Sequence, residues 1–330
     1  MKGASFQRRL ESASCPQQFR LARPVSAKGR ANRIARDSGR APFGSLTARM
    51  FAAASCLRNP AFAAVTILFC TGFTASAAEH TLRLPDHLQQ GQLVIGRAPP
   101  GTVIEFGGRP VRVGPDGAFV LGLERDAPAA ALLEVRYADG VQATRKLQVA
   151  RRDYRIERVE GLPQKTVTPD PQTAARIERE QAAVAQARKR DDAREDFLHG
   201  FVLPVQDARI SGVYGSQRID NGTPKAPHMG LDMAVPVGTP VHAPAAGIVT
   251  FAEPDLVLTG GTVLIDHGYG LSSSFLHMSR LDVKVGDRVE RGKVIGAAGM
   301  TGRASGPHVH WGFNWFDVRL DPALLPKPSG

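Results

Sequence analysis

Short apolar runs that alternate with polar residues fill residues 80–160, and this period of two is typical of half-buried β-strands. The runs include Leu82/Leu84, Leu93/Ile95 and Val111/Val113. Turn dipeptides such as Gly107-Gly108 separate them. Strands of this length and spacing predict a small β-sandwich module over residues 79–162. Its sequence holds no catalytic constellation, which favours a solubilising or docking role.

A polar helix is predicted after this module. Asp170-Pro171 is a helix start, because an acidic N-cap is followed by proline at the first helical position. Between residues 171 and 199 lie six basic and six acidic side chains, and Ile177 and Val184 mark a narrow apolar stripe. So narrow a stripe favours a connector helix over a coiled-coil partner helix. We therefore expect a helical linker over residues 163–200.

Short β-runs return from Phe201 onward. Runs such as GTVLIDHG and LSSSFLHMS are separated by glycine and proline turns, and no useful helical pattern interrupts them. The sequence thus predicts an all-β protein with two β domains joined by a polar helix. The second domain spans residues 201–330.

The segment that precedes the first module has the pattern of an export signal. Arg58 supplies a positive charge, Ala61 to Phe73 are mainly apolar, and Ala75-Ser76-Ala77 matches a small-x-small cleavage pattern. We expect a signal peptide over residues 50–78 and a location in the periplasm or cell envelope. An uncleaved segment anchored in the inner membrane is the alternative. The arginine-rich leader over residues 1–49 suggests that translation starts at Met50, and a genuine extension from Met1 is the alternative.

The charge of the chain is concentrated in that leader. The formal charge is +11 for the whole chain, and residues 1–49 hold eleven basic and two acidic side chains. From Glu79 onward the balance is about +1, so no nucleic-acid partner is predicted. All three cysteines precede Glu79, which excludes a disulfide scaffold or thiolate metal site in the later chain.

The histidines of the second domain indicate a metal site. His228 and Asp232 are four residues apart in HMGLD, while His308 and His310 share one strand face because a strand repeats every two residues. A catalytic zinc ion commonly has three protein ligands and one open position. His228, Asp232 and one histidine of the HxH pair would supply that set. The other histidine of the pair and His277 would then be available for proton transfer.

Other candidates have plainer interpretations. We expect His242 to be structural, and His267 to stabilise a turn rather than to support the metal ligands. Arg218 could bind a substrate carboxylate or form a surface ion pair. Lys293 lies in a stretch that echoes lipoyl- and biotinyl-carrier hairpins, but a carrier leaves the histidines and Asp232 unexplained.

A resemblance to the M23 family of zinc metallopeptidases, the lysostaphin or LytM type, covers roughly residues 201–322. It is carried by HMGLDMAVPVGTPVHAPAAGIVTFA and by GTVLIDHGYGLSSSFLHMSRLDVKVGDRVERGKVIGAAGMTGRASGPHVHWGF. The resemblance implies a mostly antiparallel β-sheet with the metal in an open groove. It also implies the site residues. Zinc, one ion per chain, would be bound by His228, Asp232 and His310, with His277 and His308 as catalytic imidazoles.

All five positions hold the residue that the resemblance requires, so we expect an active zinc-dependent endopeptidase. Its substrate would be peptidoglycan stem peptides or cross-links, with a D-Ala to diaminopimelate bond favoured over an oligoglycine bridge. Cell-division or cell-envelope proteins are further candidate partners, and membrane contact is expected only if the signal segment is uncleaved. The alternative function is a catalytically silent LytM-type activator of a cell-wall amidase. HExxH is absent, so proton transfer would rest on imidazole.

Overall fold

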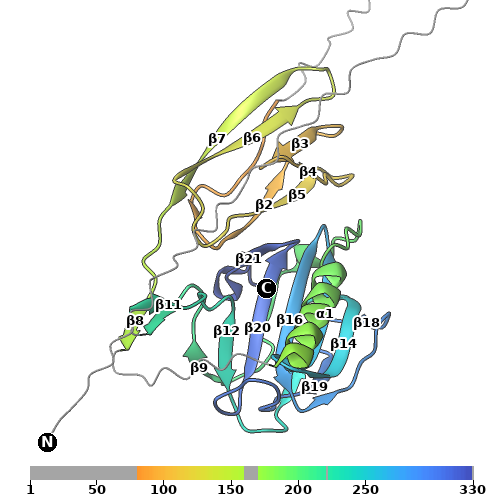
Figure 1. Ribbon diagram of the computed structural model, residues 1–330. Helices are drawn as coiled ribbons and strands as arrows, with labels where there is room; N and C mark the ends of the chain where they lie inside the picture. The colour runs from red at the N-terminus through yellow and green to blue at the C-terminus, as the bar shows by residue number, and fades with distance from the viewer. Residues whose placement is uncertain (1–79, 160–169, 221, 329–330) are drawn as a thin grey trace, which may run out of the picture. The chain divides into compact units, whose positions relative to one another are not determined.

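The structure is a computed structural model that describes residues 80–159, 170–220 and 222–328. All the described residues belong to one compact unit. The predicted leader over residues 1–49 and signal peptide over residues 50–78 lie outside the described residues. Within them strands are the main regular structure, with one α-helix and two short 3-10 helices, which confirms the expected mostly β fold (Figure 1).

The first β region contains a five-stranded sheet in the order β1-β7-β6-β3-β4 and an antiparallel pair of strands, β2 and β5. Their bounds are β1 Leu88–Gln89, β2 Leu93–Arg97, β3 Val103–Phe106, β4 Arg109–Val111, β5 Ala118–Gly122, β6 Ala130–Arg136 and β7 Gln142–Ala150. The sequence alternation is visible in β6, where Leu133 and Val135 are buried while Leu132 and Glu134 are exposed. The buried side chains of both sheets contribute to the hydrophobic core.

A short three-stranded sheet joins the end of this region to the start of the next. β8 (Ile156–Val159) pairs in parallel with β10 (Gln217–Asp220), and β10 pairs antiparallel with β11 (Thr223–Pro224). The ring centroids of Tyr154 and Tyr214 lie 6.3 Å apart in an edge arrangement beside it.

Helix α1 (Pro171–Ala187) begins where the sequence predicts. The Asp170 carboxylate accepts hydrogen bonds from the backbone N–H groups of Gln172 and Thr173, both at 3.0 Å. Because α1 packs against β14, its partly buried Ile177 and Val184 line a cavity over the second sheet. These two residues are the narrow stripe of the sequence pattern.

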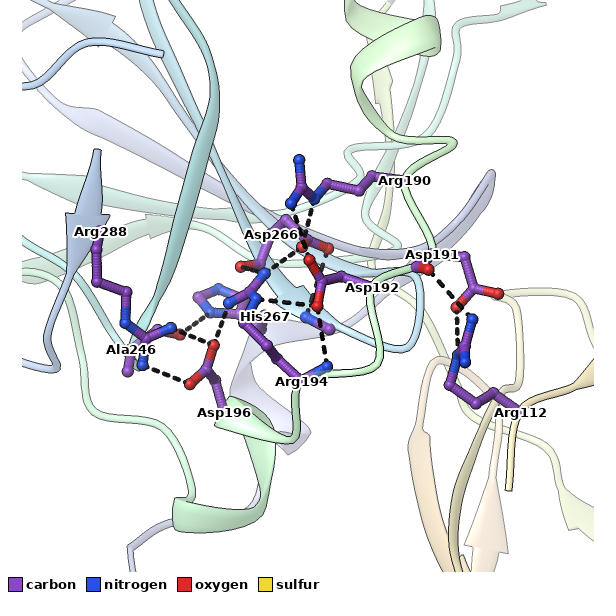
Figure 2. A network of polar contacts seen from close by, with 11 residues as sticks. Arg112, Arg190, Asp191, Asp192, Arg194, Asp196, Ala246, Asp266, His267 and Arg288 are labelled. Atoms are coloured by element: carbon purple, nitrogen blue, oxygen red, sulfur yellow. Dashed lines mark hydrogen bonds and ion pairs between the residues drawn. The ribbon is translucent and has the colours of Figure 1, made fainter. Parts of the chain in front are cut away.

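Beyond α1, ion pairs hold the connecting chain on the second sheet. The helix ends at Ala187 although polar helix-forming residues continue to Asp196. Arg194 pairs with Asp266, and Asp196 accepts two hydrogen bonds of 2.6 and 2.7 Å from Arg288 (Figure 2). These contacts explain why the helix stops before the short 3-10 helix η1 (Asp196–His199).

The second sheet is antiparallel and has the order β18-β14-β15-β16-β20-β12-β9, with β21 paired to β20. Its strands are β9 Arg209–Gly212, β12 Leu231–Ala234, β14 Gly247–Leu256, β15 Gly260–Gly268, β16 Leu271–Met278, β18 Arg288–Val289, β20 Val309–Trp315 and β21 Val318–Leu320. A smaller sheet, β13-β19-β17, consists of β13 Pro240–His242, β17 Arg280–Leu281 and β19 Val294–Ala297. The short 3-10 helix η2 (Pro322–Leu324) follows β21.

Strand β20 divides its residues between two faces of the sheet. Val309, Trp311 and Phe313 are buried on one face, and the alternate positions, His310 and Asn314 among them, lie on the other. The second face is the one that carries the candidate site. None of the helices in the described parts of the chain is long and apolar enough to span a bilayer.

Candidate active site

The three predicted metal ligands meet on one face of the second sheet. Asp232 of β12 lies directly opposite His310 of β20, so their side chains share one face, and His228 stands just before β12. Asp232 Oδ1 is 2.8 Å from His310 Nδ1 and 3.0 Å from His228 Nε2. The two ring nitrogens are themselves 3.0 Å apart. Strand register therefore joins residues that are up to 82 positions apart in the sequence.

Two glycines make room for this arrangement. A Cβ atom on Gly230 would lie 2.5 Å from His310 Nε2, and one on Gly212 would lie 2.3 Å from Asp232 Oδ2. A side chain at either position would displace the adjacent ligand. Sequence reasoning missed both glycines, although HMGLD contains Gly230, because the close approach depends on how β9, β12 and β20 pair.

The surroundings set the protonation of the three residues. Burial alone would raise the pKa of Asp232, but hydrogen bonds from His228 and His310 outweigh it and hold that pKa well below its usual range. Burial lowers the pKa of His310, against the hydrogen bond to Asp232. Burial likewise opposes protonation of His228, yet its contacts with Asp232 raise its pKa overall. Asp232 is therefore ionised and His310 is neutral, as metal coordination requires.

These residues fit a metal ion. Their ligand atoms all lie within 4.8 Å of one another, and no other such group occurs in the described parts of the chain. Atoms bound tetrahedrally to zinc at 2.0–2.1 Å lie roughly 3.3 Å apart, so the observed separations need only a small opening. The Nδ1–H of His228 donates to the Val213 carbonyl at 3.0 Å, which leaves its Nε2 lone pair facing the cluster. Two imidazoles and a carboxylate form a donor set that suits zinc.

The two remaining predicted histidines lie beside this cluster. The rings of His277 and His308 have centroids 4.8 Å apart, and His308 Nε2 is 3.8 Å from Asp232 Oδ1. His277 Nδ1–H donates to the Thr301 carbonyl at 2.9 Å, and His308 Nδ1–H donates to the Gly306 carbonyl at 2.8 Å. In both rings Nε2 is thus the nitrogen available for proton transfer. The structure brings all five predicted residues to one place, and their chemical roles stay predictions.

His277 is held in an unusual backbone conformation. Its backbone angle φ is +66°, a value that residues other than glycine rarely adopt. Its backbone N–H donates to the Thr259 carbonyl at 2.8 Å, and burial lowers the pKa of its ring. The strained residue lies at the site, which is where such strain tends to be retained.

Two other histidines have structural partners. His242 Nδ1 bonds to the Pro204 carbonyl at 3.2 Å. His267 is fully buried at the end of β15, where it bonds to the Ala246 carbonyl at 2.7 Å and to Ser273 Oγ at 2.9 Å (Figure 2 shows His267 and Ala246). His267 is therefore a core residue that joins neighbouring strands rather than a support for a metal ligand.

Arg218 and Lys293 lie on the surface. Arg218 is 3.6 Å from Glu157, and both side chains are more than half exposed, as the surface ion-pair interpretation expects. Lys293 is exposed in the turn before β19.

Comparisons with known proteins agree with this geometry. A sequence model described as Peptidase family M23 matches residues 226–322, which include all five site residues. The chain is 40% identical over 104 residues to peptidoglycan DD-endopeptidase ShyA of Vibrio cholerae, or 31% of this chain and 24% of that protein. It is 42% identical over 131 residues to DD-carboxypeptidase/endopeptidase Mpg of Neisseria meningitidis, or 39% of this chain and 30% of that protein. The chain thus matches about a quarter to a third of these curated relatives.

A solved structure extends the likeness beyond the matched domain. The crystal structure of a candidate peptidase M23 from Pseudomonas aeruginosa superposes with a TM-score of 0.56 at 35% identity. The alignment covers 72% of this chain and 93% of that chain, which is far more than the residues of the family match.

Proposed function

Because this chain belongs to peptidase family M23, we propose that it is a zinc-dependent endopeptidase that hydrolyses peptide bonds of peptidoglycan. The observation that carries the proposal is the convergence of His228, Asp232 and His310, with His277 and His308 beside them. The names of the relatives support peptidoglycan as the substrate, since ShyA is a peptidoglycan DD-endopeptidase.

His228, Asp232 and His310 would hold a single zinc ion. When bound, zinc supplies a water molecule whose pKa is lowered to about 7 and polarises the carbonyl of the bond to be cut. The protein's own contribution is to keep Asp232 ionised and His310 neutral and to fix the tautomer of His228 through the Val213 carbonyl.

His277 and His308 would move the protons. Since each donates its Nδ1–H to a backbone carbonyl, the Nε2 atom of each neutral ring is a proton acceptor. One ring takes the proton of the attacking water, and that proton then passes to the nitrogen of the leaving amine. Two rings 4.8 Å apart disfavour double protonation, so the pair would carry one proton at a time.

We further propose that the bond cut is a D-Ala to diaminopimelate cross-link and that the protein acts in the periplasm or cell envelope. The names of the relatives, DD-endopeptidase and DD-carboxypeptidase/endopeptidase, support this choice of bond. The signal pattern of residues 50–78 supports the location.

The test is digestion of isolated sacculi by the purified protein, after its bound metal has been quantified, with and without a chelator. We expect one zinc ion per chain and chelator-sensitive conversion of cross-linked muropeptide dimers into monomers, identified by mass spectrometry. A full zinc complement with intact sacculi would contradict the proposal and favour the amidase activator. Addition of a cell-wall amidase to the same assay would then detect activation directly.

A further inference from the structure

Two partly buried arginines beside the second sheet have no partner of opposite charge among the described residues. Arg188 is the C-cap residue of α1, and Arg319 lies in β21, where it is paired with Asn314 of β20. Among the residues that the structure describes, neither guanidinium forms an ion pair, whereas Arg194 and Arg288 at the same sheet do. Burial lowers the pKa of both, and at Arg188 the charge of Arg319 adds to the effect. Arginine remains charged at neutral pH nevertheless.

A cavity of about 510 Å³ opens beside the two arginines. Its lining includes Lys189 and Asn314, while Arg109 and Asp317 at the same cavity pair with each other. Asn314 is fully buried, and its Oδ1 has no hydrogen-bond partner within the described parts of the chain. Arg188 Nε is likewise buried without a partner. Buried polar atoms that lack partners are costly, so a ligand that satisfies them is stabilised there.

The cavity lies on the same sheet face as the metal ligands. Asp232 is opposite His310 and Arg319 is opposite Asn314, and along β20 the positions His310, Gly312 and Asn314 alternate onto this one face. The rise of a strand places Asn314 about 13 Å from His310. Gly312 lies between them and is buried, with the side chain of Ser274 from β16 packed over it.

Leu276 connects the two places. It lies opposite His310 in the β16–β20 ladder, and it lines with Arg188 and Arg319 a second cavity beneath α1. An extended peptide rises about 3.3–3.6 Å per residue. A peptide cut at the metal centre would therefore reach the arginines with a group about four residues from the cut bond.

We propose that Arg188 and Arg319 form a carboxylate subsite that positions a free carboxylate of a peptidoglycan stem peptide for cleavage at the metal centre. The proposal rests on the proposed function, and it names the free carboxylate as the feature of the substrate that the subsite would recognise. Two guanidinium groups offer planar, paired N–H donors that match a carboxylate. Asn314 Oδ1 would accept a hydrogen bond from a peptide N–H of the same ligand, which a simple anion lacks. Arg188 and Arg319 are specificity-determining residues in this scheme.

The test combines one change in the protein with one in the substrate. Arg319→Met and Arg188→Met replace each guanidinium by an apolar chain. The control is Arg179→Met, because Arg179 lies on α1 and is exposed. The substrates are cross-linked muropeptide dimers, either native or with their carboxylates converted to amides by carbodiimide and ammonia.

For the wild type and Arg179→Met we expect amidation to lower kcat/KM by about 10- to 100-fold, chiefly through KM, as for the loss of a charge-assisted hydrogen bond. On native dimers, Arg319→Met should have a kcat/KM that is lower than that of the wild type by a similar factor. Amidation of the dimers should then lower the kcat/KM of Arg319→Met only a little further. If the role of Arg319 were merely structural, amidation would instead lower kcat/KM by the same factor in Arg319→Met as in the wild type. That result would overturn the proposal.

A binding measurement separates this proposal from the proposed function. Calorimetry of native dimers with the chelator-treated protein needs no turnover. If hydrolysis fails altogether but Arg319→Met weakens binding about tenfold or more relative to Arg179→Met, the subsite is supported and the enzyme is not. Equal binding by the wild type and Arg319→Met, including none by either, overturns the subsite whatever the activity.

Discussion

Two buried polar clusters on the second sheet differ in how their charges are balanced. Around Asp266, each carboxylate meets an arginine, since Arg190 and Arg194 both contact Asp266 and Arg194 also contacts Asp192 and Asp196 (Figure 2). At the candidate active site, the Asp232 carboxylate instead meets ring nitrogens that converge on it and on each other.

The difference separates structure from function. A cluster whose charges are paired within the chain needs nothing from outside, and it holds the linker on the sheet. A cluster of converging ligand atoms calls for a cation from solution, and the unpaired Arg188 and Arg319 call for an anion. A buried polar group that lacks a partner, rather than burial or polarity alone, is therefore the feature that marks the candidate sites.

The largest effect should follow removal of a metal ligand. His228→Ala should lose both zinc and turnover, because it removes one of three ligands. His308→Ala and His277→Ala should keep zinc and lose turnover by about 10²–10⁴-fold, the usual contribution of acid–base catalysis. Zinc content and muropeptide release from sacculi measure the two properties separately.

The control for these variants is His87→Ala, an exposed histidine of the first β region, which should change neither property. Zinc loss in His308→Ala, together with zinc retention in His310→Ala, would exchange the ligand and catalytic roles within the HxH pair.

The internally paired cluster should respond in stability instead. Arg194→Met leaves the buried Asp266 with Arg190 alone, at 3.2 Å, and should lower the free energy of unfolding by about 3 kcal/mol, the upper value for a lost hydrogen bond to a charged group. Arg319→Met should raise that free energy, because it removes a partly buried cation without a counter-charge. Urea unfolding with Arg179→Met as the exposed control measures both. If Arg194→Met left the free energy of unfolding unchanged, the distinction between the two clusters would be wrong.

The pH dependence of the free energy of unfolding tests the role of His267 beside the internally paired cluster. Burial lowers its pKa to about 4, so the fold favours the neutral ring, and its stabilising contribution is present above pH 6.5 and is lost as the pH falls through 4. The difference in unfolding free energy between wild type and His267→Gln should shrink by about 3 kcal/mol from pH 7 to pH 4.

The variant is needed because Asp266 acts in the opposite direction. Burial raises the pKa of Asp266 to about 6, so its contribution is lost as the pH rises from about 4 to 6. Asp266 is present in both proteins, and their difference isolates His267. A difference that does not change with pH would show that the ring is not kept neutral by its surroundings.

Much of the candidate site and of the fold could be predicted from the spacing of residues that are close in the sequence. HMGLD and HVH bring His228, Asp232 and His310 within reach of one metal ion once β12 and β20 pair, and alternation predicted the strands. The start of α1 followed from Asp170-Pro171. These signals are local, because a cap or a strand face is determined by neighbours in the sequence.

Non-local features were not predictable in the same way. The helix formers after Ala187 gave no sign that Arg194 and Asp196 pair with the second sheet. His267 resembled a turn residue, but strand packing buries it completely. Such outcomes depend on register and on contacts between distant segments, which a single sequence does not reveal.

Gly230→Ala should have the smallest of these effects and is the most direct test of how the fold holds the ligands. Its Cβ would lie 2.5 Å from His310 Nε2 and 2.6 Å from the carbonyl oxygen of Trp311, so the ring and the adjoining backbone of β20 must move away from β12. We expect zinc affinity to fall about 10- to 100-fold, as it does when the surroundings of a ligand are disturbed. Excess zinc should restore turnover, because all three ligands remain. Wild-type zinc affinity in Gly230→Ala would show that His310 can shift without cost, and that the close glycine contact does not position it.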